Sequence, residues 1–438
     1  MLNSINIPQN AISWAVACAA AATFCLASSV VYNIFFHPLA RYPGPLSHAA
    51  SRVPYFIRVF KGTLPFDMLD FHTRYGDVVR IAPDELAFSH PDAWKDIMGH
   101  SKGGLYLEKA SWFYRPLEYD PPHIFNEGRQ AHSLLRRQLA HSFSDKGMRD
   151  QEPMIRGEDT VDISAWYNYT TFDIIGDLSF GESFGCLKGS NYDEWIEIKE
   201  VLLALVPPSM RDRRERLRDF TRQKMLRFDH RQAHRQAETL VVAGSETTAT
   251  LLSGVTYLLL KNPEAYQRLR EEVRSTFSSE DDINLSSAAK LPYMLACVEE
   301  ALRMYPPGAI GPPRVTPKGG AEILGARIPG RVFTTRSSTT FVANISYPHT
   351  FHPERFLGDP RFSNDRHNVL QPFHIGPRSC LGRNLAYSEM RLILALLFFN
   401  FDMELSDDSQ DWIQQKNVIM WQRGPLKVHL TYIHRNSA

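Results

Sequence analysis

Charged residues are absent from the first 40 positions of this 438-residue chain, which contain no Asp, Glu, Lys or Arg. Residues 11–36 are almost continuously apolar, and a helix over this stretch can cross a bilayer. The alternative is a cleaved signal peptide, which requires a basic start and a shorter apolar stretch, and the sequence has neither. We therefore expect a membrane anchor over residues 1–40.

Cysteine is also scarce, and the charges are balanced. The five cysteines are odd in number and scattered, which excludes a disulfide framework, favours a reducing compartment and leaves at least one thiol free for chemistry. A formal net charge of +1 gives no global field that would attract nucleic acid. The arginines of Arg211–Gln236 are interleaved with acidic residues, so we expect a solvated helix face there and no nucleic-acid partner.

Basic residues follow the apolar stretch before any acidic residue appears. Arg41, Arg52, Arg58 and Lys61 come first, and the positive-inside rule places the remaining chain in the cytoplasm. The Pro-Gly-Pro sequence within residues 41–46 predicts a stiff hinge. Residues 47–438 contain no repeat, low-complexity tract or second linker, so they are predicted to form one domain.

The periodicity of apolar residues predicts a mainly α fold. Long helices are expected over Gln236–Leu260, Leu291–Tyr305 and Leu385–Phe399. Asn262 can cap a further helix that has Pro263 at its first position. The stretch Arg314–Arg331 is rich in Gly and Pro and holds short apolar pairs, which indicates a minor sheet of short strands.

The segment Phe373–Gly382 fits the pattern F-x-x-G-x-R-x-C-x-G at every fixed position. In a chain of this composition, the Phe, Gly, Cys and Gly of the pattern would coincide roughly once in a thousand such chains. The segment resembles the cysteine-ligand loop of cytochromes P450. The resemblance implies the cytochrome P450 fold, a helical haem-binding domain with minor sheets, in which Cys380 is the axial ligand of the haem iron.

Each fixed residue of this loop has a physical reason to be there. A thiolate that binds the iron on the side opposite dioxygen pushes electron density onto the iron, and this favours cleavage of the O–O bond. Gly376 and Gly382 allow the backbone that follows Phe373 to turn tightly beside a porphyrin, and Arg378 is expected to pair with a haem propionate. The helix that begins near Asn384 directs its positive end toward the thiolate. Outside this pattern, an inert buried cysteine would be the usual interpretation.

The segment Ala243–Thr248 lies within the longest predicted helix and matches the family's oxygen-activation motif. Thr247 can bond back to the carbonyl of Ala243, which loosens the helix beside Gly244 and opens a groove for dioxygen and water. The resemblance implies that Thr247 and Glu246 relay protons in that groove. Without the cysteine loop, packing of small residues would be the default interpretation.

A charged triad of the family is also present. Glu300 and Arg303 stand one helical turn apart, and Arg355 in Pro353-Glu354-Arg355-Phe356 completes the Glu-Arg-Arg set. The resemblance implies a buried structural network that braces the cysteine loop. An isolated E-x-x-R would usually be a surface pair.

Three more residues are expected at the haem propionates. His132 and Arg136 stand where the family has W-x-x-x-R, and His132, which replaces the tryptophan, still offers an N–H donor. Arg314, just after two prolines, matches another propionate-binding arginine. A solvated side chain is the alternative for either arginine.

The similarity extends from the anchor to the last helix and looks closest to fungal microsomal enzymes such as isotrichodermin hydroxylases. It implies a monooxygenase of the endoplasmic reticulum membrane, with the catalytic domain facing the cytoplasm and haem b as cofactor. NADPH would supply electrons through NADPH-cytochrome P450 reductase. One oxygen atom of O2 would then be inserted into a lipophilic small molecule, a terpenoid or polyketide of fungal secondary metabolism.

Three segments are shorter than the family pattern: after Pro153, at 200–236 and at 329–353. These losses affect the substrate roof and one pocket wall more than the haem cradle. The alternatives are therefore a non-catalytic haem-binding remnant or an incomplete gene model. A haem-thiolate isomerase or dehydratase is a further alternative, against which the presence of Glu246 and Thr247 argues.

Overall fold

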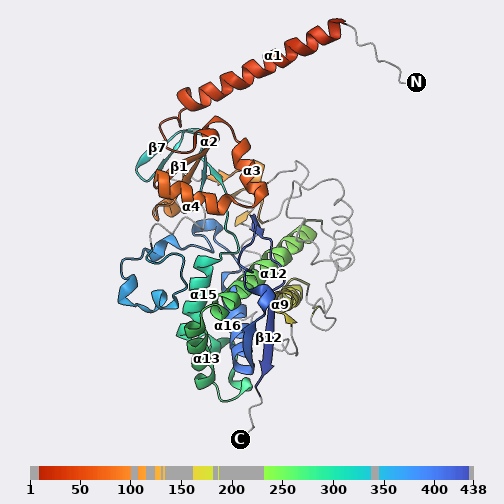
Figure 1. The fold of residues 1–438 in the computed structure, drawn as a ribbon, viewed down its shortest axis with the longest axis vertical. Coiled ribbons are helices and arrows are strands. Elements are labelled where there is room, and N and C mark those ends of the chain that lie inside the picture. Colours follow the sequence, from red (N-terminus) through yellow and green to blue (C-terminus); the bar gives the residue numbers. More distant parts are fainter. Residues whose placement is uncertain are drawn as a thin grey trace, which may run out of the picture.

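Helix α1 (Gln9–Val31) projects from one end of the folded domain in the computed structural model, as Figure 1 shows. The structure describes residues 9–99, 107–114, 124–129, 132–133, 161–180, 186, 231–336 and 345–433. A π-helical turn, η1 (Tyr32–Phe36), continues α1 toward the domain. The window Val16–Phe36 is long and apolar enough to cross a membrane, and none of it is buried. The N-terminal helix that the sequence predicts is therefore present.

The end of this helix is hydrogen-bonded to the domain. The Asn33 side chain donates to Ala50 O at 2.9 Å, and the guanidinium of buried Arg80 donates to Asn33 O at 2.8 Å. A Cβ on Gly44 would lie only 2.3 Å from Arg80 O. The proline-rich segment 41–46, expected to be a hinge, thus packs closely against the strand that carries Arg80.

A five-stranded sheet lies at the anchor end of the domain, with strand order β1-β2-β8-β5-β3. The strands are β1 (Val78–Ala82), β2 (Glu85–Phe88), β3 (Glu108–Lys109), β5 (Arg314–Val315) and β8 (Phe333–Thr335). Helices α2 (Leu46–Ala50) and α4 (Leu64–Tyr75) pack against β1, with α3 (Val53–Lys61) between them in the chain, and α5 (Ala93–Met98) packs against the strand β6 (Ala321–Ile323). Strands β6 and β7 (Ala326–Ile328) form a hairpin. The predicted minor sheet after Arg314 is therefore confirmed.

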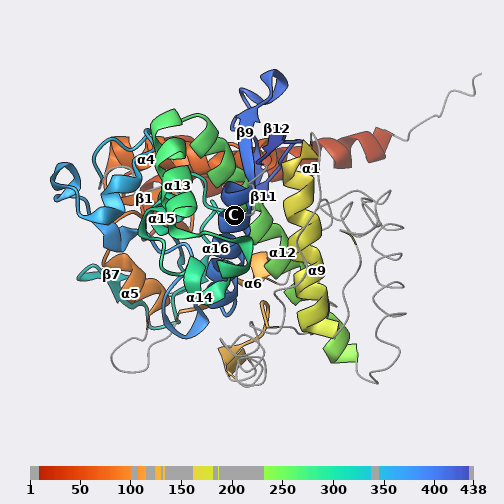
Figure 2. The same cartoon turned by 90° about the horizontal axis from the view of Figure 1, so that it is seen from below.

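The helical core lies farther from the anchor. Its long helices are α9 (Ile163–Phe180), α12 (Arg231–Leu260), α13 (Pro263–Thr276), α15 (Pro292–Met304) and α16 (Arg383–Asn400). Figure 2 shows α9 alongside α12. In α12, Ala249, Leu252 and Val255 recur at helical spacing and are fully buried, which explains why this segment folds as a core helix. The predicted mainly α fold is confirmed.

The helix boundaries agree with the sequence to within a few residues, apart from the start of α12. Helix α15 ends at Met304, just before two prolines that cannot continue it. Helix α13 begins at Pro263 with Asn262 at the N-cap position, but the Asn262 side chain does not cap it. Asn262 Nδ2 instead donates to Leu258 O at 2.7 Å in the last turn of α12.

A second sheet fixes the C-terminal segment beside α9. Strand β12 (Lys427–Tyr432) lies between β4 (Val161–Asp162) and β9 (Phe401–Leu405). Asp162 Oδ1 accepts from the N–H of Ser164 at 3.1 Å and from the N–H of Leu426 at 3.0 Å. The residues just before β12 are therefore held at the N-terminal end of α9.

Short elements complete the described part of the chain. They are α6 (Ser111–Tyr114), α14 (Leu285–Ala288), the paired strands β10 (Asn417–Val418) and β11 (Met420–Trp421), and the 3-10 turns η5 (Glu280–Asp282), η7 (Pro353–Leu357), η8 (Pro360–Phe362), η9 (His367–Val369), η10 (Gly376–Arg378) and η11 (Asp407–Ser409). The turns η7 to η9 form the approach to the cysteine loop, and η10 lies within it.

Candidate active site

A cavity of about 310 Å³ lies between helix α12 and the cysteine loop. Its lining includes Ala243, Gly244, Thr247 and Thr248 from α12, Phe373, Arg378, Cys380 and Gly382 from the loop, and Lys109, His132 and Arg314 from elsewhere. The volume lies within the range of small-molecule sites. Chain folding thus brings together the two segments that the sequence predicts to act together.

The cysteine loop closes on itself just before α16. The Cys380 N–H donates to Phe373 O at 2.7 Å, with η10 between the two residues. Helix α16 begins at Arg383, with Gly382 at the N-cap position. Cys380 is exposed and lines the cavity directly before the N-terminus of this 18-residue helix, whose dipole favours a negative charge there.

The two glycines of the loop serve different purposes. Gly376 has φ +77°, and a Cβ there would lie 2.3 Å from Met98 O at the end of α5. A side chain at this position is excluded by both conformation and space. A Cβ on Gly382 would meet no atom of the described residues within 4 Å, although Gly382 lines the cavity. Gly376 therefore fixes the loop against α5, and Gly382 leaves free space beside Cys380.

One wall of the cavity is positively charged. Lys109 joins Arg314 and Arg378 there, and burial, followed by the charges of these two arginines, lowers the Lys109 pKa to about 6. Arg314 is buried, and its Nη1 has no hydrogen-bond partner among the described residues. The described residues that line the cavity include no Asp or Glu. This wall therefore suits an anionic group, and the two propionates of a haem fit that requirement.

His132 is the one member of the expected W-x-x-x-R match that can be placed. It is buried and lines the same cavity as Cys380. Arg136 lies outside the described residues, as do many positions in the segments that the sequence predicts to be short. Arg378, also predicted for this wall, donates from Nη1 to Glu127 O at 2.9 Å.

Helix α12 contains the side-chain-to-backbone bond that the motif predicts. Thr247 Oγ1 donates to Ala243 O at 2.6 Å, and both residues line the cavity. Gly244 also serves packing, because a Cβ there would lie 2.8 Å from the Ile175 side chain of α9. Thr247 therefore brings a hydroxyl to the cavity at the point where α9 and α12 approach each other.

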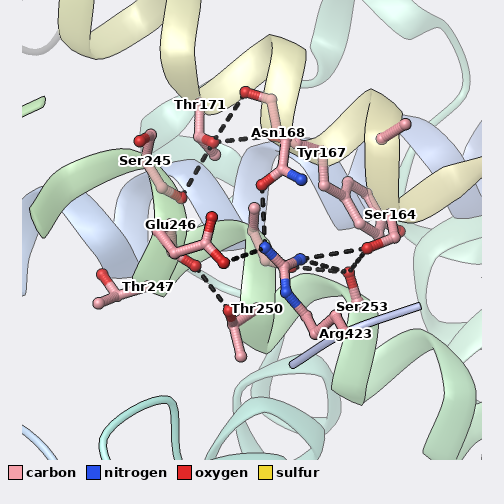
Figure 3. Close-up of polar contacts among 12 residues, drawn as sticks. Ser164, Tyr167, Asn168, Thr171, Ser245, Glu246, Thr247, Thr250, Ser253 and Arg423 are labelled. Atoms are coloured by element: carbon pink, nitrogen blue, oxygen red, sulfur yellow. Dashed lines mark hydrogen bonds and ion pairs between the residues drawn. The ribbon is translucent and has the colours of Figure 1, made fainter. Parts of the chain in front are cut away.

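Glu246 faces away from this hydroxyl. Its Oε1 accepts from Arg423 Nη2 at 2.8 Å, as Figure 3 shows, and Glu246 is not part of the cavity lining. Successive residues of an α-helix point roughly 100° apart, so adjacency in sequence does not place two side chains together. The expected relay partner of Thr247 is thus engaged in an ion pair on another side of α12.

The expected charged triad is assembled and buried. Glu300 Oε2 accepts from Arg303 Nε at 2.7 Å and from Arg355 Nε at 3.2 Å. Asp365, which the sequence analysis missed, pairs with Arg355 as a fourth buried charge. Two cations and two anions therefore compensate one another and hold the approach to the cysteine loop on α15.

A second carboxyl group lies near the cavity without facing it. Glu389 of α16 is buried, and it is hydrogen-bonded to Thr248, which lines the cavity. Burial raises the pKa of the Glu389 carboxyl to about 8, and the bond to Thr248 opposes this shift to a smaller extent. Glu389 is therefore a mainly neutral acid at pH 7, and no sequence pattern indicates it, because its partner Thr248 lies on another helix.

The raised pKa of Glu389 predicts a pH-dependent stability. Between the ordinary carboxyl pKa of 4.5 and about 8, the folded protein holds a proton that the unfolded chain releases, so wild-type stability falls as pH rises through this window. Glu389→Gln removes that dependence. As pH rises through this window, the free energy of unfolding of the variant should therefore increase relative to that of wild type by up to about 1 kcal/mol per pH unit. Unfolding followed by circular dichroism at pH 5 and pH 8 measures the difference. Parallel losses in both proteins would contradict it.

Known proteins resemble this chain over most of its length. The cytochrome P450 monooxygenase prhB of Penicillium brasilianum is 41% identical over 94% of this chain and 97% of its own. The cytochrome P450 monooxygenase FUM2 of Gibberella moniliformis is 39% identical over 92% of this chain and 99% of its own. The cytochrome P450 monooxygenase tpeC of Talaromyces stipitatus is 41% identical over 92% of this chain and 91% of its own.

The alignment with prhB also has a bearing on the short segments. It runs over 473 positions but includes only 94% of this 438-residue chain, so the relative has residues that this chain lacks. A family model described as Cytochrome P450 matches residues 209–430, which include both α12 and the cysteine loop. With relatives of 39–41% identity along nearly its whole length, the chain belongs to the cytochrome P450 family and is an oxidoreductase of the monooxygenase type.

Proposed function

We propose that this protein inserts one oxygen atom of O2 into a lipophilic small molecule, a terpenoid or a polyketide of fungal secondary metabolism. The observation that carries the proposal is the single cavity that contains both Cys380 and Thr247. Apolar side chains such as Ile124, Leu240 and Leu381 line much of the remainder, which favours a lipophilic substrate. The three relatives described above come from fungi, which supports the origin of the substrate.

Cys380 would hold the iron of haem b, and the positive wall would hold its propionates. Arg314 and Arg378 supply the charges, and His132 adds an N–H donor. Lys109, mainly neutral at pH 7 beside these two arginines, would be protonated when a propionate lies next to it. When bound, the haem supplies the activation of dioxygen with electrons from NADPH. Lys109 would be a further propionate contact, and the sequence does not indicate it because a single lysine in a two-residue strand has no recognisable pattern.

The Thr247 hydroxyl is proposed to hold and pass protons within the cavity. Since it donates to Ala243 O, its own oxygen can accept a hydrogen bond from a cavity water, and passing a proton on would require its O–H to turn from that carbonyl toward the cavity. Proton transfer of this kind needs a group fixed within hydrogen-bond reach. The apolar lining limits the entry of bulk water, which would otherwise deliver protons without control.

The proposed arrangement in the cell follows from the N-terminal helix. Residues 1–40 would anchor the protein in the endoplasmic reticulum membrane, residues 41–46 would join the anchor to the domain, and residues 47–438 would face the cytoplasm. Basic residues directly after the apolar stretch support this orientation. NADPH-cytochrome P450 reductase in the same membrane would be the electron donor.

An isotope experiment tests the reaction. Membranes that contain the protein and a reductase are screened with terpenoids and polyketides for a spin-state shift of the haem, and binders are incubated with NADPH under ¹⁸O₂. We expect a product with one ¹⁸O atom. A product without ¹⁸O would favour the isomerase or dehydratase alternative, and a protein without bound haem would favour the remnant or an incomplete gene model.

The anchor gives a separate prediction. Full-length protein should resist carbonate extraction from membranes, because the window Val16–Phe36 is apolar and unburied. A protein that begins at Tyr32 should be extracted almost completely. Leu26→Arg, which places a charge near the middle of the window, should weaken retention by a few kcal/mol of insertion free energy. Secretion of a shortened mature form would instead support a signal peptide.

A further inference from the structure

Arg423 is a buried cation where three parts of the chain meet. It follows β11, and Figure 3 shows its guanidinium between α9 and α12. Arg423 Nη1 lies 3.2 Å from both Ser164 Oγ and Ser253 Oγ. Arg423 Nη2 donates to Asn168 Oδ1 at 3.0 Å and to Glu246 Oε1 at 2.8 Å. One side chain thus links the C-terminal segment to both helices.

The contact with Glu246 is an ion pair that is largely removed from water. The side chain of Arg423 is 0% exposed and that of Glu246 is 17% exposed. A guanidinium at such a position carries a large desolvation cost, which a nearby carboxylate offsets. Removing either partner therefore leaves the other as a buried charge without this counterion, and the two residues should act as a unit.

Along the same stretch of α12, four Ser and Thr hydroxyl groups donate hydrogen bonds to backbone carbonyls one turn earlier in the helix. Ser245 bonds back to Val241 O at 2.7 Å, Thr247 to Ala243 O at 2.6 Å, Thr250 to Glu246 O at 2.7 Å and Ser253 to Ala249 O at 2.8 Å. Each such bond competes with the helical hydrogen bond of that carbonyl and makes bending easier. The direction in which Thr247 faces therefore depends on contacts from outside the helix.

The segment that carries Arg423 is well placed to supply such a contact. Before Arg423, Trp421 stacks on Tyr305 with ring centroids 4.6 Å apart. After it, the Ile163 N–H donates to Leu426 O at 3.0 Å, and Leu426 in turn donates to Asp162. Arg423 thus projects from a backbone that is fixed on both sides.

We propose that Arg423 is a positioning residue for the turn of α12 that contains Thr247. Its ion pair with Glu246 fixes the rotation of residues 243–247, so that the Thr247 hydroxyl faces the cavity. Glu246 then contributes as the counterion of Arg423 and not as an acid inside the cavity. The inference rests on the proposed function, since positioning affects turnover only if the Thr247 hydroxyl takes part in it.

A double-mutant cycle on the full-length holoenzyme in reductase-containing membranes tests this role. The variants are Glu246→Gln, Arg423→Gln and the double variant, with Arg270→Gln as a control that removes an ion pair with Asp402 on a more exposed surface. The readout is hydrogen peroxide formed per NADPH in protein that retains haem. Each single variant should raise it on the order of tenfold, because a small misplacement of a reacting group has effects of this size or larger. The control should match wild type.

Four results distinguish the roles. The double variant should be no worse than either single variant, and Arg423→Lys, which keeps the charge, should recover most of the coupling. Uncoupling by Glu246→Gln with a normal Arg423→Gln would overturn the inference and make Glu246 an acid in its own right. Effects that multiply in the double variant would also overturn it. If Arg423→Gln takes up no haem, Arg423→Met, which keeps much of the side-chain bulk and removes the charge, replaces it in the cycle, with the same non-additivity expected.

A measurement without substrate separates this inference from the proposed function. Haem retention after heating should fall in each single variant and recover in the double variant, because the unpaired buried charge is then absent. A wild type that oxidises no screened substrate would count against the proposed function alone. Additive losses of haem retention in the cycle would count against the Arg423–Glu246 unit whatever the enzyme's activity.

Discussion

Replacing Cys380 by alanine should abolish the thiolate-type carbon monoxide difference band of the reduced protein and lower turnover to background. Cys380 lines the cavity before the N-terminus of α16, where the helix dipole favours a thiolate. Alanine offers no electron pair to an iron, so the proposed thiolate ligand would be missing and the haem could no longer activate dioxygen in the same way. Wild type and variant are purified, reduced and exposed to carbon monoxide, and their spectra are compared.

Cys297→Ala is the matched control. Cys297 is fully buried in the helical core between hydrophobic residues and does not line the cavity. The same substitution there should cost about 1 kcal/mol of stability and leave the band unchanged. If Cys380→Ala keeps the wild-type spectrum, or if Cys297→Ala loses it, the assignment of Cys380 as the iron ligand is wrong.

Thr247→Ala should separate electron consumption from product formation. The variant keeps Cys380 and the positive wall, so haem content and the carbon monoxide band should survive. Loss of a group that passes protons usually slows its step on the order of a hundredfold, although water can partly replace it. NADPH oxidation should therefore continue while product falls and hydrogen peroxide accumulates. The ratio of peroxide to NADPH, measured with a reductase and a substrate, gives the result.

Thr250→Ala provides the comparison on the same helix. Thr250 also bonds back to a helix carbonyl, that of Glu246 at 2.7 Å, but it does not line the cavity. A change in helix bending alone would affect both variants, whereas loss of a cavity hydroxyl affects only Thr247→Ala. Equal coupling in wild type and Thr247→Ala would reduce the motif to helix packing and reopen the isomerase alternative.

Local patterns predicted the parts of the fold that depend on nearby residues. The buried repeat of α12, the proline at the start of α13 and the closed turn before Cys380 all follow from side chains within a few positions of one another. The bond from Thr247 to Ala243 is of the same kind, because it spans one helical turn. These features need no knowledge of the chain path.

Features that join distant segments were not predictable from the residues alone. Arg423 meets Glu246 only because the C-terminal sheet brings the end of the chain to α9, and nothing beside either residue indicates the other. Asp365 beside Arg355 and Lys109 beside Arg314 depend in the same way on how loops and strands meet. Asn262 shows that a local preference can also fail, since its side chain does not cap α13 and instead donates to Leu258 O of the preceding helix.

The hydrogen bonds that join Asn33 to Ala50 and Arg80 bear on how the domain would sit at a membrane if helix α1 is the proposed anchor. The helical window Val16–Phe36 has 21 residues and a length of about 31 Å, close to the thickness of the hydrocarbon layer. A thinner bilayer increases the tilt of such a helix. Because both the side chain and the backbone carbonyl of Asn33 in η1 are hydrogen-bonded to the domain, a change of tilt is transmitted to the domain. The angle at which the cavity faces the lipid surface should therefore vary with bilayer thickness.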